Sequence, residues 1–167
     1  VRLACQVRPQ SDIWITPLMP PRIGSTDYQD DRGITGNEQE VVAMFVDLRG
    51  FSSYAETRLP YDVVLVLNQF MEHMSAALES TRGHYAQFTG DGLFALFGLQ
   101  GGIRQACRDA LSSAVEMQRR LDSLNQHIHN EIEAPLKIGI GIHCGDAIVG
   151  PMGPPNSRLV SAIGDSV

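Results

Sequence analysis

The stretch QFTGDGLFALFG, residues 87–98, decides how this chain folds. Its two hydrophobic runs flank Gly90-Asp91-Gly92, and a Gly-Asp-Gly tract in such a setting predicts a tight β-hairpin turn. Asp91 has two interpretations at this stage. An Asp in a turn can simply bond its own backbone, or it can be one of a pair of carboxylates that form a site.

The segments around the hairpin define the fold class. Residues 41–48 (VVAMFVDL) read as a buried strand, and apolar residues recur at helical spacing between Pro60 and Gly83 and again over residues 103–128. Residues 49–59 lack periodicity and predict a loop. LKIGIGIHCG (136–145) is a further strand, followed after a tight turn by DAIVG and then by a short extended run, RLVSAIG. This order predicts an α+β, ferredoxin-like βαββαβ palm with both helices on one face of the sheet.

This topology places the end of the first strand, with Asp47, beside the hairpin turn that carries Asp91. Two neighbouring carboxylates repel each other unless a cation compensates them. Oxygen ligands with few other protein donors suit Mg²⁺, and two ions about 4 Å apart can assist a phosphoryl-type displacement. The RGFSS segment after Asp47 offers backbone N–H groups to phosphates. Either Asp alone is explained by turn or surface chemistry, but the pair in this topology favours a metal site.

Composition excludes several classes of protein. The 167 residues are 43% hydrophobic, which supports a core, and the net charge of −6 argues against a nucleic-acid binder. No run resembles a membrane helix. Cys5, Cys107 and Cys144 are widely spaced, which fits a reducing compartment, so we expect a cytoplasmic location.

Residues 19–40 are polar, acidic and rich in Pro and Gly, as in a linker. Because the chain begins with Val inside a strand-like run, we expect a fragment of a longer polypeptide, which could be membrane-tethered.

Four motifs in order carry a family resemblance: FVDLRGFS, QFTGDGLFALFG, IGIHCGDAIVG and SAIGDSV. From about Glu40 to the last residue the chain resembles the catalytic domain of class III adenylyl/guanylyl cyclases. The resemblance implies a homodimer with active sites at the interface and conversion of ATP or GTP to a 3′,5′-cyclic nucleotide and pyrophosphate. It also implies that Asp47 and Asp91 are the catalytic residues that bind two Mg²⁺ or Mn²⁺ ions, with the Leu48 carbonyl as a further metal ligand. Gly50, Phe51 and Ser52 would form the loop that binds the phosphates.

Base recognition departs from both patterns of this family. Adenylyl cyclases usually carry Lys at the position of Gln87 and Asp or Thr at Ser161, whereas guanylyl cyclases tend to carry Glu and Cys. A Gln amide both donates and accepts hydrogen bonds, so either base fits, with a modest preference for ATP.

The family's transition-state Asn and Arg follow the SAIGDSV tract, so we expect this fragment itself to be inactive. The alternative is a catalytically inactive cyclase-like module for dimerisation or nucleotide sensing. A diguanylate cyclase is disfavoured because its signature is missing.

A second resemblance concerns residues 1–18. VRLACQVRP is similar to the last strand of plant-type [2Fe–2S] ferredoxin domains, in which Cys5 would be the fourth cluster ligand. The other three ligands would lie upstream, and a lone Cys in a strand is otherwise a small buried hydrophobe. Among the remaining candidates, His143 and Cys144 are interpreted as packing residues and His84 as a surface residue.

Overall fold

The computed structural model describes residues 36–154 and 158–167. Cys5, the strands expected in residues 1–18 and most of the 19–40 segment lie outside the described residues. The elements in chain order are β1 (Asn37–Leu48), α1 (Phe51–Glu56), α2 (Pro60–Ser80), β2 (His84–Thr89), β3 (Gly92–Phe97), α3 (Ile103–His127), β4 (Ile138–Met152) and β5 (Leu159–Ile163). No helix within these described ranges has the length and apolar character needed to cross a bilayer.

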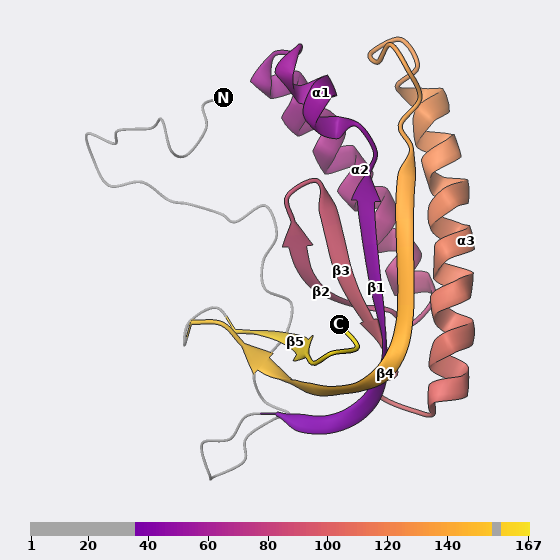
Figure 1. Cartoon of the computed structure of the whole chain (residues 1–167). Helices are drawn as coiled ribbons and strands as arrows, with labels where there is room; N and C mark the ends of the chain where they lie inside the picture. Colours follow the sequence, from indigo (N-terminus) through magenta and orange to yellow (C-terminus); the bar gives the residue numbers. More distant parts are fainter. Residues whose placement is uncertain (1–35, 155–157) are drawn as a thin grey trace, which may run out of the picture.

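The strands form a five-stranded sheet in the order β2-β3-β1-β4-β5, and all neighbouring pairs are antiparallel. β1 therefore lies between the hairpin and β4, while α2 and α3 lie on one face of the sheet (Figure 1). The expected ferredoxin-like βαββαβ palm is confirmed. An antiparallel sheet with helices on one side leaves its other face accessible.

The face under the helices carries the larger core. Alternate residues of β1 point toward the helices, and side chains at three- and four-residue spacing on α2 and α3 pack against them. Burial of each large side chain of this kind contributes about 1.5–3 kcal/mol. The central members of this cluster are Val42, Met44 and Val46 of β1, Phe70 and Met74 of α2, and Met117 and Leu121 of α3.

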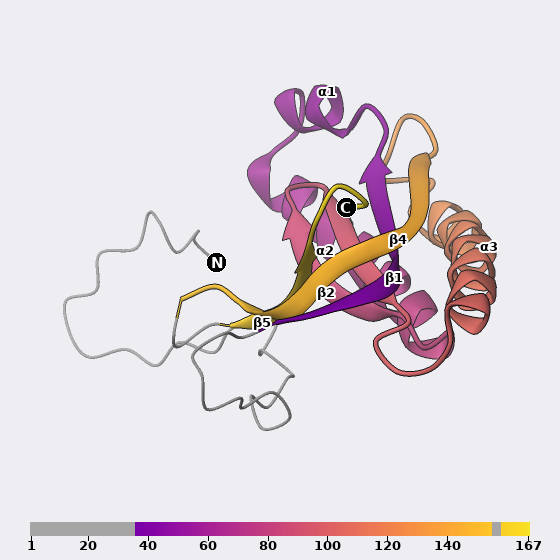
Figure 2. The ribbon, with the colours of Figure 1, turned by 60° about the horizontal axis from the view of Figure 1, so that its bottom comes forward.

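Part of the opposite face, near the start of β2, is covered by β5. β4 curves strongly and carries β5 back across the sheet toward β2 (Figure 2). Val160 and Ala162 of β5 then bury a second apolar cluster together with Ala86 of β2. The His84 ring donates a hydrogen bond to the Val160 backbone carbonyl, and its Nε2 atom is buried without a partner in the described residues. The interpretation of His84 as a surface residue is therefore wrong, because β5 covers the start of β2.

The structure differs from expectation in two further segments. Residues expected to form a loop after β1 instead form α1, in which Phe51 is buried and its ring stacks on Tyr54 at 5.7 Å between centroids. A helix of six residues is too short to show periodicity in the sequence. The second difference is β4, which runs unbroken through the expected tight turn because Gly145 and Asp146 continue the ladder opposite Val41 and Glu40. β1 also begins at Asn37, earlier than the expected strand.

The helix ends match the sequence signals. Pro60 occupies the first turn of α2, and the Gly83 N–H donates to the Leu78 carbonyl at 2.9 Å just beyond the end of that helix. The connection from α3 to β4 is fixed by Asn125. Its Nδ2 donates to the Leu136 carbonyl at 3.0 Å, and its Oδ1 accepts from the Leu136 N–H at 2.8 Å. These bonds set where β4 joins β1.

Candidate active site

Asp47 and Asp91 come together at one end of the sheet. Asp47 is the penultimate residue of β1 and lies directly opposite Gly92 in the β1–β3 ladder. Asp91 immediately precedes Gly92 in the hairpin turn. Gly90 of this turn has a φ of 77°, in the left-handed region that glycine tolerates. The side chain of Asp47 is exposed and that of Asp91 is half-buried. The juxtaposition expected from the topology is present.

Gly92 determines how closely the two strands approach at this point. A Cβ on Gly92 would overlap the Val46 carbonyl oxygen and would lie 3.0 Å from Thr89 Oγ1 and 3.4 Å from Asp47 Cα. Both strand backbones are held by the ladder, so neither can give way easily. The absence of a side chain at Gly92 therefore sets the spacing between Asp47 and the turn that carries Asp91.

The carboxylates of Asp47 and Asp91 form no ion pair in the described part of the chain, although the Arg49 guanidinium lies nearby, over Gly139. Within residues 36–154 and 158–167, neither Asp47 nor Asp91 has a hydrogen bond or an ion pair with another side chain. The same part of the chain contains no group of three or more His, Cys, Asp or Glu residues that would enclose a metal ion by itself. Two carboxylates lie at the end of β1 and in the adjacent hairpin turn, which leaves the other metal-ligand positions to water or phosphate. Mg²⁺ prefers this kind of coordination, with a few carboxylate ligands and several water or phosphate oxygens.

Arg49 is a site residue that the sequence interpretation missed. It lies two residues after Asp47, on the same face of the extended chain, and its N–H donates to the Lys137 carbonyl at 2.8 Å. A Cβ on Gly139 would overlap the Arg49 guanidinium, so this group lies over Gly139, which is the β4 residue opposite Asp47. Side chains alternate between the two faces along a strand, so in FVDLRGFS Arg49 falls on the same face as Asp47. This alternation was the sequence signal for Arg49.

The segment after β1 turns sharply into α1. Gly50 has a φ of 72°, in the left-handed region, and forms the N-terminal boundary of α1. Phe51 anchors this turn in the core, whereas Ser52 is exposed. The first N–H groups of a helix have no partner within the helix. Leu48, in contrast, has a buried side chain and offers only its backbone to the site.

A bulge in β2 decides where Gln87 faces. The ladder between β2 and β3 shifts register between Tyr85 and Gln87, so Gln87 lies opposite Phe94 on the face away from the helices. Gln87 is exposed there, on the same face as Asp47. Ser161 of β5 lies opposite Gly150, and its neighbours Val160 and Ala162 face the second cluster. The Ser161 side chain thus points to the other face of the β4–β5 ribbon, which favours Gln87 over Ser161 as a base contact.

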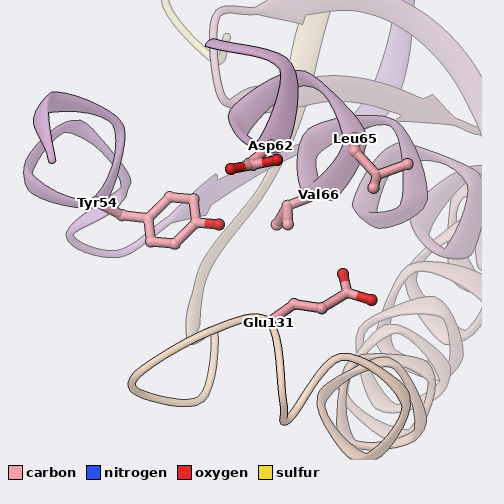
Figure 3. Close-up of a pocket in the computed structure, with 5 residues that line it drawn as sticks. All are labelled: Tyr54, Asp62, Leu65, Val66 and Glu131. Atoms are coloured by element: carbon pink, nitrogen blue, oxygen red, sulfur yellow. The ribbon is translucent and has the colours of Figure 1, made fainter. Parts of the chain in front are cut away.

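One cavity, of about 230 Å³, lies on the helix side and not at the aspartates. Tyr54 of α1, three residues of α2 and Glu131 after α3 line it (Figure 3). Burial raises the pKa of Tyr54, Arg58 opposes that effect, and Asp62 and Glu131 add to it. Because Val66 in its wall belongs to the core under the helices, this cavity is separate from the face that carries Asp47.

Comparison with known proteins agrees with this geometry. A family model described as the adenylate and guanylate cyclase catalytic domain matches residues 35–160. The chain belongs to this family. It is 30% identical over 77% of its length to "Adenylate cyclase 1" of Rhizobium meliloti (strain 1021) and 29% identical over 77% to the adenylate cyclase of Anabaena cylindrica. These matches cover 19% and 26% of the two relatives, so the chain spans only a minor part of each.

Solved structures of this cyclase family have the same fold. The guanylyl cyclase Cya2 superposes with a TM-score of 0.75 at 32% identity, over 80% of this chain and 68% of that one. The adenylyl cyclase CyaB from P. aeruginosa gives a TM-score of 0.75 at 25% identity, over 80% and 69%. Because one is a guanylyl and the other an adenylyl cyclase, the likeness identifies the cyclase domain but not the base of the substrate.

Proposed function

We propose that this chain is the catalytic segment of a nucleotidyl cyclase that converts ATP, and less readily GTP, to a 3′,5′-cyclic nucleotide and pyrophosphate. The observation that carries the proposal is the meeting of Asp47 and Asp91, neither of which forms an ion pair within the described residues, inside a domain of the cyclase family. Retaining two uncompensated carboxylates in one place is costly unless a cation binds there.

Asp47, Asp91 and the Leu48 carbonyl would hold two Mg²⁺ or Mn²⁺ ions. When bound, such ions stabilise charge on the attacking and leaving oxygens of a phosphoryl transfer. The residues around them bind and orient the nucleotide. In the proposal, the Gly50, Phe51 and Ser52 backbone and the Arg49 guanidinium face the triphosphate, and Gln87 faces the base.

The reaction needs little covalent chemistry from the protein. The ribose 3′-oxygen attacks the α-phosphorus, the bond from that phosphorus to the β,γ-diphosphate oxygen breaks, and the 3′-hydroxyl proton is lost. The protein must therefore bring the 3′-oxygen into line with the leaving oxygen and stabilise the charge that develops. The strand spacing set by Gly92 fixes the positions of the groups that do so.

We also propose that a second copy of the chain completes the site. The face with Asp47 and Gln87 is open, because both side chains are exposed there. Phe45 is an exposed apolar side chain on the same face, at 42% exposure, which is consistent with a surface that a partner covers.

The test is product analysis of the full-length polypeptide after incubation with ATP or GTP, each with Mg²⁺ and with Mn²⁺. D47A and D91A should each lower cyclic nucleotide formation by about 10³-fold, as expected for removal of a principal electrostatic stabiliser. Asp122→Ala is the matched control, because Asp122 is an exposed Asp on α3 whose side chain only accepts a bond from Gln118. Activity of either site variant within about tenfold of wild type would exclude the assignment.

A catalytically inactive nucleotide-sensing module is the second candidate. The observation that favours it is that Gln87 and Ser161 match neither the adenylyl nor the guanylyl pattern. The two candidates separate in one experiment. In the full-length polypeptide, Mn²⁺-dependent binding of a non-cleavable ATP analogue that requires Asp47 and Asp91, without cyclic product from either nucleotide, identifies the module. Product formation identifies the enzyme.

A further inference from the structure

Two cysteines that are far apart in the sequence meet between α3 and β4. Cys144 lies directly opposite Val42 in the β1–β4 ladder, so it shares the face of the sheet that the helices cover. Cys107 of α3 packs against the same core cluster, which includes Val42. Both thiols are free. The register of the sheet and the packing of α3 therefore place both side chains on the helix side of the sheet.

The two side chains interact directly. The pKa of Cys144 is raised by loss of water around its sulfur, by the adjacent Cys107 with which it shares a hydrogen bond, and by Glu40 across the strand pair. Cys144 is exposed and Cys107 is half-buried. A small reagent can therefore reach Cys144 first, with Cys107 already beside it.

We propose that Cys107 and Cys144 form a reversible thiol–disulfide site that reacts with small disulfides such as oxidised glutathione. Sulfur atoms that are hydrogen-bond partners need only a short approach to reach the bonding distance of about 2.05 Å. The inference is independent of the cyclase function, because it uses neither aspartate nor any nucleotide contact.

The exchange proceeds in two balanced steps. The thiolate of Cys144, a minor form at neutral pH because the pKa of this thiol is raised, attacks one sulfur of the glutathione disulfide. This attack forms a mixed disulfide and expels one glutathione thiolate. The thiolate of Cys107 then attacks the Cys144 sulfur and expels the second glutathione. The protein loses two electrons and two protons, and the small disulfide gains both to become two thiols. The second step is intramolecular, so it outcompetes attack by a second small disulfide.

The resulting bond links α3 to β4. β4 pairs with β1 along the whole length of β1, including the Asp47–Gly139 position. A covalent tie at Cys144 therefore constrains the strand that adjoins the site, although Cys144 itself lies on the helix side of the sheet.

The experiment uses the reduced chain with Cys5→Ser, which keeps the third thiol out of the reaction. The protein is incubated with oxidised glutathione, free thiols are blocked, and the digest is analysed by mass spectrometry without reductant. The expected product is a pair of peptides joined by a disulfide between Cys107 and Cys144. Its amount should exceed that of the doubly glutathionylated protein by about tenfold or more. C144S and C107S should stop at a single mixed disulfide. C144S changes an exposed residue, so it keeps the fold.

A second measurement tests whether the internal disulfide forms because the folded structure holds the two cysteines together or only because they belong to one chain. The same reaction is run in concentrated guanidinium chloride, where the excess of the internal link over the doubly glutathionylated product should fall at least about tenfold. Two mixed disulfides without an internal link in the folded protein would overturn the proposal. So would an equal excess of the link in the folded and the unfolded chain.

Discussion

Replacing Gly92 with Ala tests the strand spacing on which the site depends. The new Cβ would overlap the Val46 carbonyl oxygen and would meet Asp47 Cα at 3.4 Å. Because these are backbone atoms of a paired strand, the overlap can be relieved only by moving β3 away from β1. Overpacking of this kind costs about 1–3 kcal/mol, and with a urea dependence near 2 kcal/mol per molar the unfolding midpoint should fall by about 1 M.

Gly141→Ala is the matched control. Gly141 is also a strand glycine in the same sheet, opposite Phe45, but a Cβ there meets nothing within 4 Å and its φ is not positive. Ala is favoured over Gly in a strand by about 0.5–1 kcal/mol, so this variant should be as stable as wild type or slightly more stable. Urea unfolding followed by circular dichroism measures both variants. Equal midpoints for the two would refute the argument that contact at Gly92 sets the strand spacing.

Three further predictions concern the base, acid stability and the core. In the full-length polypeptide, Q87K should raise the ATP:GTP ratio of kcat/KM and Q87E with S161C should lower it, each by about tenfold, since one neutral hydrogen bond is worth roughly 0.5–1.5 kcal/mol. An unchanged ratio in both variants means that Gln87 does not face the base. Burial lowers the pKa of His84 from its ordinary value of 6.5, against the hydrogen bond with Val160. Below pH 6.5 the unfolded chain therefore binds more protons at His84 than the folded chain does. As the pH is lowered from 6.5 to the lowered pKa of His84, the free energy of unfolding should decrease, and H84Q should not show this decrease. F70A should destabilise the fold by about 3–5 kcal/mol, because Phe70 is 0% exposed, whereas L65A at a 50% exposed position should cost less than about 1 kcal/mol in the same unfolding assay.

Local chemistry made the hairpin and the helices predictable. The turn at Gly90-Asp91-Gly92 requires a residue that tolerates positive φ, and Gly90 supplies it. The helical periodicity of α2 and α3 is long enough to place their ends within a few residues. The meeting of Asp47 and Asp91 was also predictable, because the order of elements leaves β1 beside the hairpin. The roles of these residues in binding metal and nucleotide stay predictions.

Sequence by itself therefore determined the palm fold and the carboxylate pair, since both follow from turn chemistry, side-chain period and chain order. Only the tertiary structure decided the surroundings of that pair. The curvature of β4 brings β5 over His84, and the bulge in β2 turns Gln87 to the open face. The register between β1 and β4 lays Arg49 over Gly139 and sets Cys144 beside Cys107. Each of these contacts joins residues distant in the chain, and its geometry depends on strand curvature and register that no local pattern encodes.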